Sequence, residues 1–412
     1  MESASTILVY IFVFISLYFQ VFLLATFFEK RSVMALEENG ALKLRRYPSV
    51  TIIVPCFNEE HTVSKTIFSL LKLDYPKNKL DIFIVDDGST DNTWSVVNRF
   101  KKWKNVTLFK KVNGGKYTAL NHALLSAKTE LIGCLDADSF VEQDTLKKIV
   151  KYFEDGTVMA VTPAIKIENP RKILELIQNV EYGLGIFYRK MLGSIDAIQV
   201  TPGPFSIFRK KVFDDLGPYR HAHNTEDLEI AFRMHESHYR IVNAHKAFVR
   251  TVAPKTLRGL YKQRLRWVHG FLENSLDYKH LFFNKKYGNF GMLMLPAAVI
   301  SIFSALYLVG FVLKSFGNYV VDKTVEAKIV GASVMFPSLD WFFFSTDAIV
   351  FLSIVLITMA LFMILAGKKI AEDPKRFNLD IVYFMLCYGF IVPLWLFMAV
   401  YNTIFSRRTS WR

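Results

Sequence analysis

Acidic side chains follow three apolar segments of this chain, each at the point where the segment ends. The three segments run into PCFNEE, VDDGSTDNT and LDADS. In LDADS, Asp136 and Asp138 are two residues apart, so a tight turn after a strand would aim both carboxylates at one region. Two close carboxylates repel each other unless a cation lies beside them, and hard divalent ions prefer oxygen ligands and often take the remainder from substrate phosphates. An isolated D-x-D is more often an acidic turn that caps a helix, and it is the other motifs that favour a metal site.

The second acidic cluster has both a structural and a functional interpretation. Residues 88–90 make a turn and Asp91 is placed to cap the next helix. The pair Asp86 and Asp87 is placed at a strand end, where a carboxylate can accept hydrogen bonds from a nucleobase or a ribose. Further along, VNGGKYTALNHAL puts two glycines and Lys116 before a helix, where backbone amides and a cation can meet phosphate. Alone this motif is weak, because many loop-to-helix junctions look the same.

Apolar, β-rich runs alternate with helical patterns through the segments that must position these residues. We expect strands at residues 49–55, 81–86, 106–110, 130–135 and 157–162, and helices near residues 62–72, 92–103, 117–127 and 143–153. This alternation indicates an α/β domain with a mainly parallel sheet covered by helices, in which ligands bind at the C-terminal ends of the strands. The acidic clusters therefore predict a single site.

The composition indicates a soluble domain joined to membrane spans. Of 412 residues, 52% are hydrophobic and 21% are charged, and the mean hydropathy is +0.24. A transmembrane helix needs about 20 mostly apolar residues, and residues 5–28 supply one with no signal-peptide cleavage pattern after it. Further candidate spans lie at residues 292–313, 342–366 and 381–405. We therefore predict an N-terminal transmembrane helix at 5–28, a catalytic domain at 44–255, interfacial amphipathic helices at 256–290 and a membrane region of about three spans at 291–405.

The distribution of charge predicts on which side of the membrane the domain lies. The formal net charge is +14, and Lys30 and Arg31 directly follow the first span. Because basic loops stay cytoplasmic, we expect a multi-pass protein of the plasma (inner) membrane with its catalytic domain in the cytoplasm. Three complete C-terminal spans would leave the tail SRRTSWR outside, whereas its arginines favour the inside. The span with Pro393 would then be a bent hairpin or an interfacial helix, or residues 329–335 would hold further membrane-embedded structure.

Two motifs after the predicted strands carry candidate site residues. NTEDLEIAFRM places Glu226 and Asp227 after Thr225, which is the pattern of a helix N-cap followed by first-turn acids. Such a cap would also fix the position of Asp227. TPGPFSIFRK, residues 201–210, contains a Gly-Pro turn that on its own indicates a turn before an edge strand.

The segment YKQRLRWVHG combines cations and an aromatic ring shortly before an apolar run. On a helix, Gln263, Arg266 and Trp267 share a face because they are three and four residues apart. The ordinary interpretation is a pair of snorkelling arginines, Arg264 and Arg266, on an interfacial helix. The five histidines between residues 221 and 245 match no zinc pattern, and we expect them to be solvated or capping.

Seven motifs in one order resemble the series of the family 2 glycosyltransferases, and more narrowly the membrane-embedded processive synthases of cellulose, chitin, hyaluronan and poly-N-acetylglucosamine. The motifs are VTIIVPCFNEE, VDDGSTDNT, GGKYTALNHAL, LDADS, TPGPFSIFRK, NTEDLEIAFRM and QRLRW, and they cover roughly residues 48–290. Each motif alone is weak, but seven in order are specific. The resemblance implies a GT-A-type, Rossmann-like glycosyltransferase fold for residues 44–255.

The resemblance also implies roles for individual residues. The nucleotide-sugar would be bound by Asn58, Glu59, Asp87, Lys116 and Asp136. Mg²⁺ or Mn²⁺ would be bound by Asp136 and Asp138, and Asp227 would be the catalytic base with Glu226 beside it. The acceptor and the diphosphate would meet Gly203, Phe205, Ser206, Gln263, Arg266 and Trp267, with Arg264 the more replaceable arginine.

The predicted reaction is an inverting transfer, since one base and no evident second carboxylate nucleophile favour a direct displacement that turns a UDP-α-sugar into a β-linkage. We favour UDP-N-acetylglucosamine as donor, with UDP-glucose next, and a growing polysaccharide as acceptor. The expected partners are the donor, a glycan or lipid acceptor, the bilayer and export or accessory subunits, and no nucleic acid. Two alternatives stay open: a non-processive transferase that adds one sugar to a lipid, and a catalytically silent membrane channel or scaffold subunit.

Overall fold

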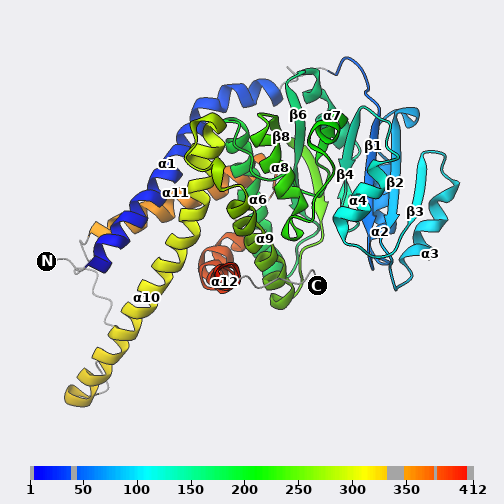
Figure 1. The fold of residues 1–412 in the computed structure, drawn as a ribbon. Coiled ribbons are helices and arrows are strands. Elements are labelled where there is room, and N and C mark those ends of the chain that lie inside the picture. Colours follow the sequence, from blue (N-terminus) through cyan, green and yellow to red (C-terminus); the bar gives the residue numbers. More distant parts are fainter. Residues whose placement is uncertain (1–3, 39–43, 332–347, 375–377, 406–412) are drawn as a thin grey trace.

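The computed structural model describes residues 4–38, 44–331, 348–374 and 378–405. Figure 1 shows a sheet domain at one end of the molecule and long helices at the other, with α6, α8 and α9 between them. The predicted division into a globular domain and apolar helices is therefore visible in the arrangement of the chain.

The central sheet has eight strands in the order β3-β2-β1-β4-β7-β6-β8-β5. Their bounds are Val50–Cys56 for β1, Leu80–Asp86 for β2, Val106–Lys110 for β3, Leu131–Cys134 for β4, Ser139–Val141 for β5, Val158–Ile167 for β6, Ile207–Arg209 for β7 and Arg240–Thr251 for β8. Strand β1 pairs in parallel with β2 and with β4, and β2 pairs in parallel with β3. The five predicted strands correspond to β1 to β4 and β6, whereas β5, β7 and β8 were not predicted.

Strand β7 corrects one sequence-based interpretation. It runs antiparallel to both neighbours and lies between β4 and β6. The Gly-Pro turn of residues 201–206 therefore leads into the middle of the sheet and not to an edge strand. This brings the turn beside the end of β4, where the LDADS motif begins.

Both faces of the sheet are buried, which explains why its first strands read as continuous apolar runs. Along β1, Ile52 and Val54 pack in one hydrophobic core, while Ile53 packs in the core on the opposite face. Successive side chains of a strand point to opposite faces, so this alternation fixes the register of β1 between its neighbours.

Helices cover the sheet and connect it to the apolar segments. Their bounds are Val63–Leu71 for α2, Thr93–Asn98 for α3, Lys116–Leu124 for α4, Thr145–Val150 for α5, Ile173–Gly193 for α6, Lys210–Leu216 for α7, Glu226–Glu236 for α8 and Leu257–Asp277 for α9. The four predicted helices correspond to α2 to α5, with α3 and α5 continued by the 3₁₀ turns Arg99–Lys102 and Lys151–Glu154. The region 256–290 contains one long helix, α9, followed by the 3₁₀ turns Lys279–Leu281 and Lys285–Tyr287, and not several amphipathic helices.

Within the described residues, four helices are long and apolar enough to cross a membrane, over Ser5–Ser32, Phe290–Ile329, Ala348–Ile370 and Leu379–Ile404. They belong to α1 (Ala4–Glu38), to the π-helical turn Phe290–Met294 with α10 (Leu295–Val330), to α11 (Ala348–Ile370) and to α12 (Leu379–Ile404). The predicted span 292–313 lies within a helix that continues to Val330, and the part of this helix that crosses the membrane stays a prediction. Charged residues beyond Leu313 are accommodated on exposed helix faces, for example as the pair Lys323 and Glu326, whose charged atoms are 2.8 Å apart. Residues 342–347 of the third predicted span, and the tail 406–412, lie outside the described residues.

Helix α12 runs unbroken through Pro393, so this segment is a single helix and not a hairpin. It packs against α9 and α6. In Figure 1, α12 is seen close to end-on whereas α1 and α10 are seen lengthwise, so α12 crosses these two helices. The interfacial alternative for the Pro393 segment stays a prediction.

Candidate active site

The loops that follow β1 and β2 are joined by side-chain hydrogen bonds. Asn58, with a backbone φ of 56°, accepts from the Thr90 amide at 2.8 Å through its side-chain oxygen. The backbone amide of Asn58 in turn donates to the Ser89 hydroxyl at 3.0 Å. The Glu59 carboxylate accepts from the Thr62 hydroxyl at 2.7 Å. The structure therefore brings PCFNEE and VDDGSTDNT together at one edge of the sheet, as the sequence predicted.

Asp87 organises the glycine loop before α4. Its carboxylate accepts from Lys111 Nζ at 2.5 Å and from the amides of Gly114 and Gly115 at 3.2 and 2.9 Å. In this structure the Gly114 and Gly115 amides are therefore bonded to Asp87, and the expected contact of backbone amides and Lys116 with phosphate stays a prediction. Gly115 has a φ of 90°, which glycine adopts without the strain of a side chain. Sequence reasoning missed Lys111, although it directly follows a predicted strand end.

Lys116, the first residue of α4, lies between two of the predicted acids. Its Nζ atom is 2.7 Å from Asp136 Oδ1 and 3.0 Å from Glu226 Oε1. Burial lowers the pKa of Lys116, but the two neighbouring carboxylates raise it more, so the net pKa lies above its ordinary value. A charged ammonium group therefore links the LDADS motif to the NTEDLE motif.

The loop of residues 201–206 reaches the same acids through its backbone. A Cβ atom on Gly203 would lie 2.5 Å from Lys116 Nζ and 2.8 Å from Asp136 Oδ1, so this close approach requires glycine. Thr201 donates to the backbone oxygen of Asp227 twice, from its amide at 3.0 Å and from its hydroxyl at 2.8 Å. Sequence reasoning missed Thr201, which ties the loop to the predicted base.

The other predicted residues of this loop have supporting positions. Phe205 has a φ of 68° and a fully buried side chain that packs in the core and not toward the acids. The Ser206 hydroxyl donates to Pro202 O at 2.7 Å. Ser206 also lies on the wall of a cavity of about 10 Å³, lined by Lys116, Leu120, Cys134, Thr201, Pro202, Gly203, Ser206, Phe208, Tyr219, Glu226 and Asp227. This cavity has room for about one water molecule and not for a sugar.

The two acids at the start of α8 have opposite pKa shifts. Burial, and then the charge of Glu226, raise the pKa of Asp227 to about 6, although Lys116 and Arg266 act in the opposite direction. Burial raises the pKa of Glu226 as well, but the charge and hydrogen bond of Lys116 outweigh it, so its net pKa is lowered. Neighbouring carboxylates with separated pKa values are typical of acid–base sites.

The pair Asp136 and Asp138 fits a divalent cation. Burial, and then the charges of Asp136 and Glu59, raise the pKa of Asp138 to about 7. Both causes disfavour the ionised form of Asp138, which a divalent cation beside this pair would stabilise. Among the described residues no group of three or more His, Cys, Asp or Glu side chains is arranged to hold a metal. An ion on this pair would therefore take its other ligands from a substrate diphosphate and water.

The QRLRW motif lies on α9, and its two arginines have different partners. Arg266 Nη1 donates to Asn224 O at 2.9 Å, two residues before Glu226. Arg264 is 4% exposed and forms two hydrogen bonds with the Glu181 carboxylate, at 2.9 and 2.8 Å. The snorkelling interpretation of Arg264 is therefore wrong, since this side chain is buried and paired. That the chemistry needs Arg266 more than Arg264 stays a prediction. No local pattern in the sequence indicated a partner on α6.

Arg264 also contacts Gln263 and Trp267 of the same motif. Its Nη1 atom donates to Gln263 Oε1 at 2.6 Å. Its guanidinium lies 4.2 Å from the centre of the Trp267 ring, which is 37% exposed. A stacked arginine holds one face of an indole, so the exposed part of Trp267 has a fixed orientation.

Thr225 occupies the N-cap position of α8, but its side chain forms no cap hydrogen bond. Its hydroxyl donates instead to Ala222 O at 2.9 Å and accepts from Asn274 Nδ2 at 3.0 Å. The predicted capping interaction is therefore replaced by a link to α9. Asn274 was not identified from the sequence, because nothing in its local pattern distinguishes it.

Comparisons with known proteins agree with this geometry. The sequence profile described as Glycosyl transferase family 2 matches residues 51–217. A poly-beta-1,6-N-acetyl-D-glucosamine synthase of Staphylococcus epidermidis is 31% identical over 363 residues, which cover 85% of this chain and 83% of the relative. A synthase of the same name from Staphylococcus aureus is 32% identical over 265 residues, which cover 63% of each chain.

A solved structure shares the fold. The mannosyltransferase PcManGT from Pyrobaculum calidifontis, in complex with GDP-Man and Mn²⁺, has a TM-score of 0.58 and 20% sequence identity, and the match covers 96% of this chain and 99% of that one. At this identity the likeness concerns the fold alone. Together with the identity to the curated synthases over most of both chains, it shows that this protein is an enzyme with a GT-A-type fold and belongs to glycosyl transferase family 2.

Proposed function

We propose that this enzyme is a membrane-embedded, inverting β-glycosyltransferase that transfers sugar from a UDP-sugar to a growing polysaccharide. UDP-N-acetylglucosamine is the favoured donor, because relatives 31% identical over 85% of this chain are named as poly-beta-1,6-N-acetyl-D-glucosamine synthases. UDP-glucose is the next candidate. The acceptor is a glycan or a lipid-linked chain, and export or accessory subunits stay a prediction.

The position of Asp227 among charged neighbours is the observation that carries this proposal. A carboxylate with a pKa raised to about 6 is a better base than an ordinary aspartate and is still mostly ionised at pH 7. In the proposed step, Asp227 takes the proton of an acceptor hydroxyl while that oxygen attacks the anomeric carbon of the donor. The bond from that carbon to the diphosphate oxygen breaks, UDP leaves, and the α-linked donor gives a β-linked product.

The cations beside this base would act on the leaving group. Lys116 contacts Asp136, and the charge of Arg266 acts on both Glu226 and Asp227. Fixed positive charges stabilise negative charge that develops in a transition state, and here that charge develops on the diphosphate. Arg266 is the arginine of the QRLRW motif that we assign to this role, while the exposed part of Trp267 is available to stack on an acceptor sugar.

Asp136 and Asp138 would hold Mg²⁺ or Mn²⁺. When bound, such an ion supplies Lewis-acid neutralisation of the departing diphosphate. The raised pKa of Asp138, caused by burial and by nearby carboxylates, supports this assignment, because a bound cation would stabilise the carboxylate form that both causes disfavour. Asn58, Glu59 and the loop shaped by Asp87 are the proposed binding surface for the nucleoside.

The proposed location is the plasma (inner) membrane, with the catalytic domain in the cytoplasm. Lys30 and Arg31 end the first apolar segment on the domain side. If α10 and α11 cross the membrane and α12 lies at its surface, two crossings return the chain to the cytoplasm. The basic tail of residues 406–412 then lies inside, which removes the conflict between span count and charge.

Product analysis with a panel of donors tests this proposal. The protein, purified in lipid nanodiscs, is incubated with labelled UDP-N-acetylglucosamine, UDP-glucose and GDP-mannose, and the products are separated by size and by extraction into organic solvent. We expect a long glycan from a UDP-sugar, and loss of transfer in Asp227→Asn but not in the surface control Asp214→Asn. A short, organic-extractable product would favour the lipid transferase, and no turnover of any donor would favour the silent subunit.

A further inference from the structure

Three consecutive residues before the proposed base have a left-handed backbone. Ala222, His223 and Asn224 have φ values of 44°, 53° and 64°. Non-glycine residues are strained in this region and persist there only where surrounding contacts hold them. We call Ala222–Asn224 the left-handed turn, and only Thr225 and Glu226 separate it from Asp227.

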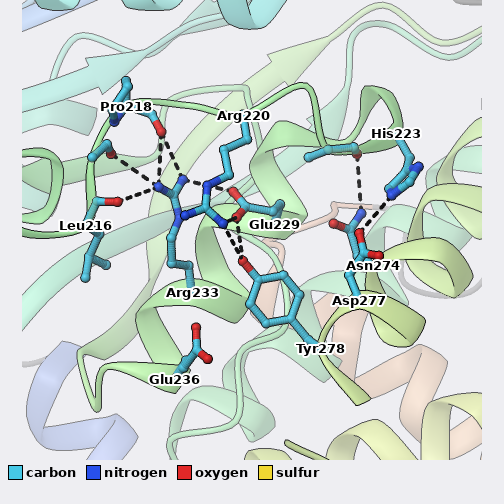
Figure 2. Close-up of polar contacts among 12 residues, drawn as sticks. Leu216, Pro218, Arg220, His223, Glu229, Arg233, Glu236, Asn274, Asp277 and Tyr278 are labelled. Atoms are coloured by element: carbon cyan, nitrogen blue, oxygen red, sulfur yellow. Dashed lines mark hydrogen bonds and ion pairs between the residues drawn. The ribbon is translucent and has the colours of Figure 1, made fainter. Parts of the chain in front are cut away.

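One face of α9 contacts each residue of the left-handed turn. Asn274 Nδ2 donates to Ala222 O at 3.3 Å, and His223 Nε2 lies 2.9 Å from Asp277 Oδ2. Figure 2 shows the His223 and Asp277 side chains meeting beside Asn274. The third contact is the hydrogen bond from Arg266 to the carbonyl that ends the turn. Residues 266, 270, 274 and 277 recur at helical spacing and therefore lie on one face of α9.

Asn274 forms the most direct connection from α9 to the base. Besides the turn, it donates to the Thr225 hydroxyl at 3.0 Å and to Gly270 O at 2.7 Å. Its side chain is 1% exposed. A Cβ atom on Gly270 would lie 2.4 Å from the Thr225 side chain, so α9 approaches Thr225 more closely than any residue but glycine would allow. This contact holds the residue from which α8 starts.

The base-bearing helix α8 is tied to the end of α9 by a second cluster, shown in Figure 2. The Glu229 carboxylate accepts from Tyr278 Oη at 2.6 Å and from Arg233 Nη2 at 2.9 Å, and Arg220 Nη1 lies 3.4 Å away. A hollow of about 440 Å³, bordered by Arg220 and Tyr278 among others, lies beside the turn. This open volume gives the turn room to move once its contacts with α9 are lost.

We propose that Asn274 is a positioning residue for the transfer reaction, which holds the left-handed turn and, through Thr225, fixes the place of Asp227. This inference rests on the proposed role of Asp227 as base. The strained backbone of the left-handed turn would relax to a different conformation if its contacts were lost. The hydrogen bonds from Asn274 on α9 prevent this change. Loss of Asn274 displaces the base while leaving the donor-binding loops of β1, β2 and β4 in place.

Kinetics of three variants test this inference. In Asn274→Leu, which keeps the side-chain size but removes the donor, we expect kcat to fall about 10- to 100-fold with little change in the KM for the UDP-sugar. Adding Ala222→Gly should restore part of kcat, because glycine adopts a positive φ without strain. Ser275→Ala is the matched control: Ser275 is also buried on α9, and its hydroxyl bonds none of the described residues.

Hydrogen–deuterium exchange provides a readout that does not depend on activity. In Asn274→Leu, amides of residues 219–228 should exchange faster, while those of β1 keep the wild-type rate. An unchanged kcat, an unchanged exchange rate, or a loss of kcat that Ala222→Gly does not relieve would each overturn the inference. If Asn274→Leu does not fold, Asp277→Ala replaces it, since that side chain is 59% exposed. There kcat should fall about threefold, and an unchanged value counts against the inference.

A wild-type protein that transfers no sugar contradicts the proposed function and not the contact between Asn274 and the left-handed turn. In that case the exchange experiment still decides whether Asn274 holds the turn. Wild-type activity combined with a fully active Asn274→Leu variant has the opposite meaning, because it leaves the proposed function intact and excludes the positioning role of Asn274.

Discussion

The acidic limb of the pH–rate profile should report the base. Burial, and then the charge of Glu226, raise the pKa of Asp227 to about 6. A base must be ionised to accept a proton, so activity is lost as pH falls through this value. Roughly nine-tenths of the groups are ionised at pH 7 and roughly one-tenth at pH 5, which predicts a fall of about tenfold in kcat/KM, the parameter that reports ionising groups of the free enzyme. An aspartate with the ordinary pKa of 3.8 would lose less than about a tenth of its activity over the same interval.

A substitution at Glu226 tests the cause of the shift as well as its direction. In Glu226→Gln a negative neighbour of Asp227 is removed, so the pKa of Asp227 falls and the acidic limb moves to lower pH. The control Glu236→Gln removes an acid from the other end of α8, where its carboxylate contacts His280, and the limb should stay in place. Initial rates of UDP release at donor concentrations well below KM, from pH 5 to pH 8, measure these limbs.

Two results would refute this reasoning. A profile that is flat between pH 5 and pH 7 would mean that Asp227 has an ordinary pKa or is not the base. If the acidic limb moves to higher pH in Glu226→Gln, the negative charge of Glu226 is not what raises the pKa of Asp227. As a control, enzyme returned from pH 5 to pH 7 must recover full activity. This recovery shows that the loss at pH 5 is due to protonation and not to unfolding.

Three further substitutions have expected outcomes. Arg264→Leu leaves the partly buried Glu181 carboxylate without its arginine partner and should cost about 3 kcal/mol of stability. The loss is measured as a lower melting temperature in detergent. The double variant with Glu181→Leu should recover most of the lost stability. Gly203→Ala puts a Cβ atom 2.5 Å from Lys116 Nζ, and we expect the rate of sugar transfer to fall at least about tenfold. The melting temperature should not change, because the Lys116 ammonium group that is displaced is the end of a flexible side chain. Asp138→Asn should raise the Mn²⁺ concentration that gives half-maximal activity about tenfold or more, whereas an unchanged Mn²⁺ requirement would exclude this residue as a ligand.

The parallel part of the sheet could be predicted because each of its strands is buried on both faces and so appears as an apolar run. The acids at the ends of β1, β2 and β4 followed from the rule that parallel strands end at one edge. Strands β5 and β7 have only three residues each, and such short segments carry no periodic signal. The predicted span 292–313 ends at the first charge, as a hydropathy criterion requires, whereas helix α10 continues to Val330 because a helix ends only where its backbone is interrupted.

The pairings within the site could not be predicted, because they join residues far apart in the chain. Arg264 and Glu181 are 83 residues apart, and Asn274 and Thr225 are 49 apart. Helical spacing correctly placed Gln263, Arg266 and Trp267 on α9, but it contains no information about which element faces them. Local patterns determine the elements, whereas the partners of buried polar groups depend on how those elements pack.

In the proposed mechanism, helix α9 is the element that relates the chemistry to the membrane. Its Arg264 pairs with Glu181 of α6, and the helix packs along α12, one of the four candidate spans. The same helix contacts the turn that precedes Asp227 through Arg266. Catalytic groups keep their geometry best when rigid elements support them. A base that is held by α9 therefore keeps a constant distance from the apolar helices. An acceptor chain that leaves along those helices would have its reactive end placed by the same element that places the base.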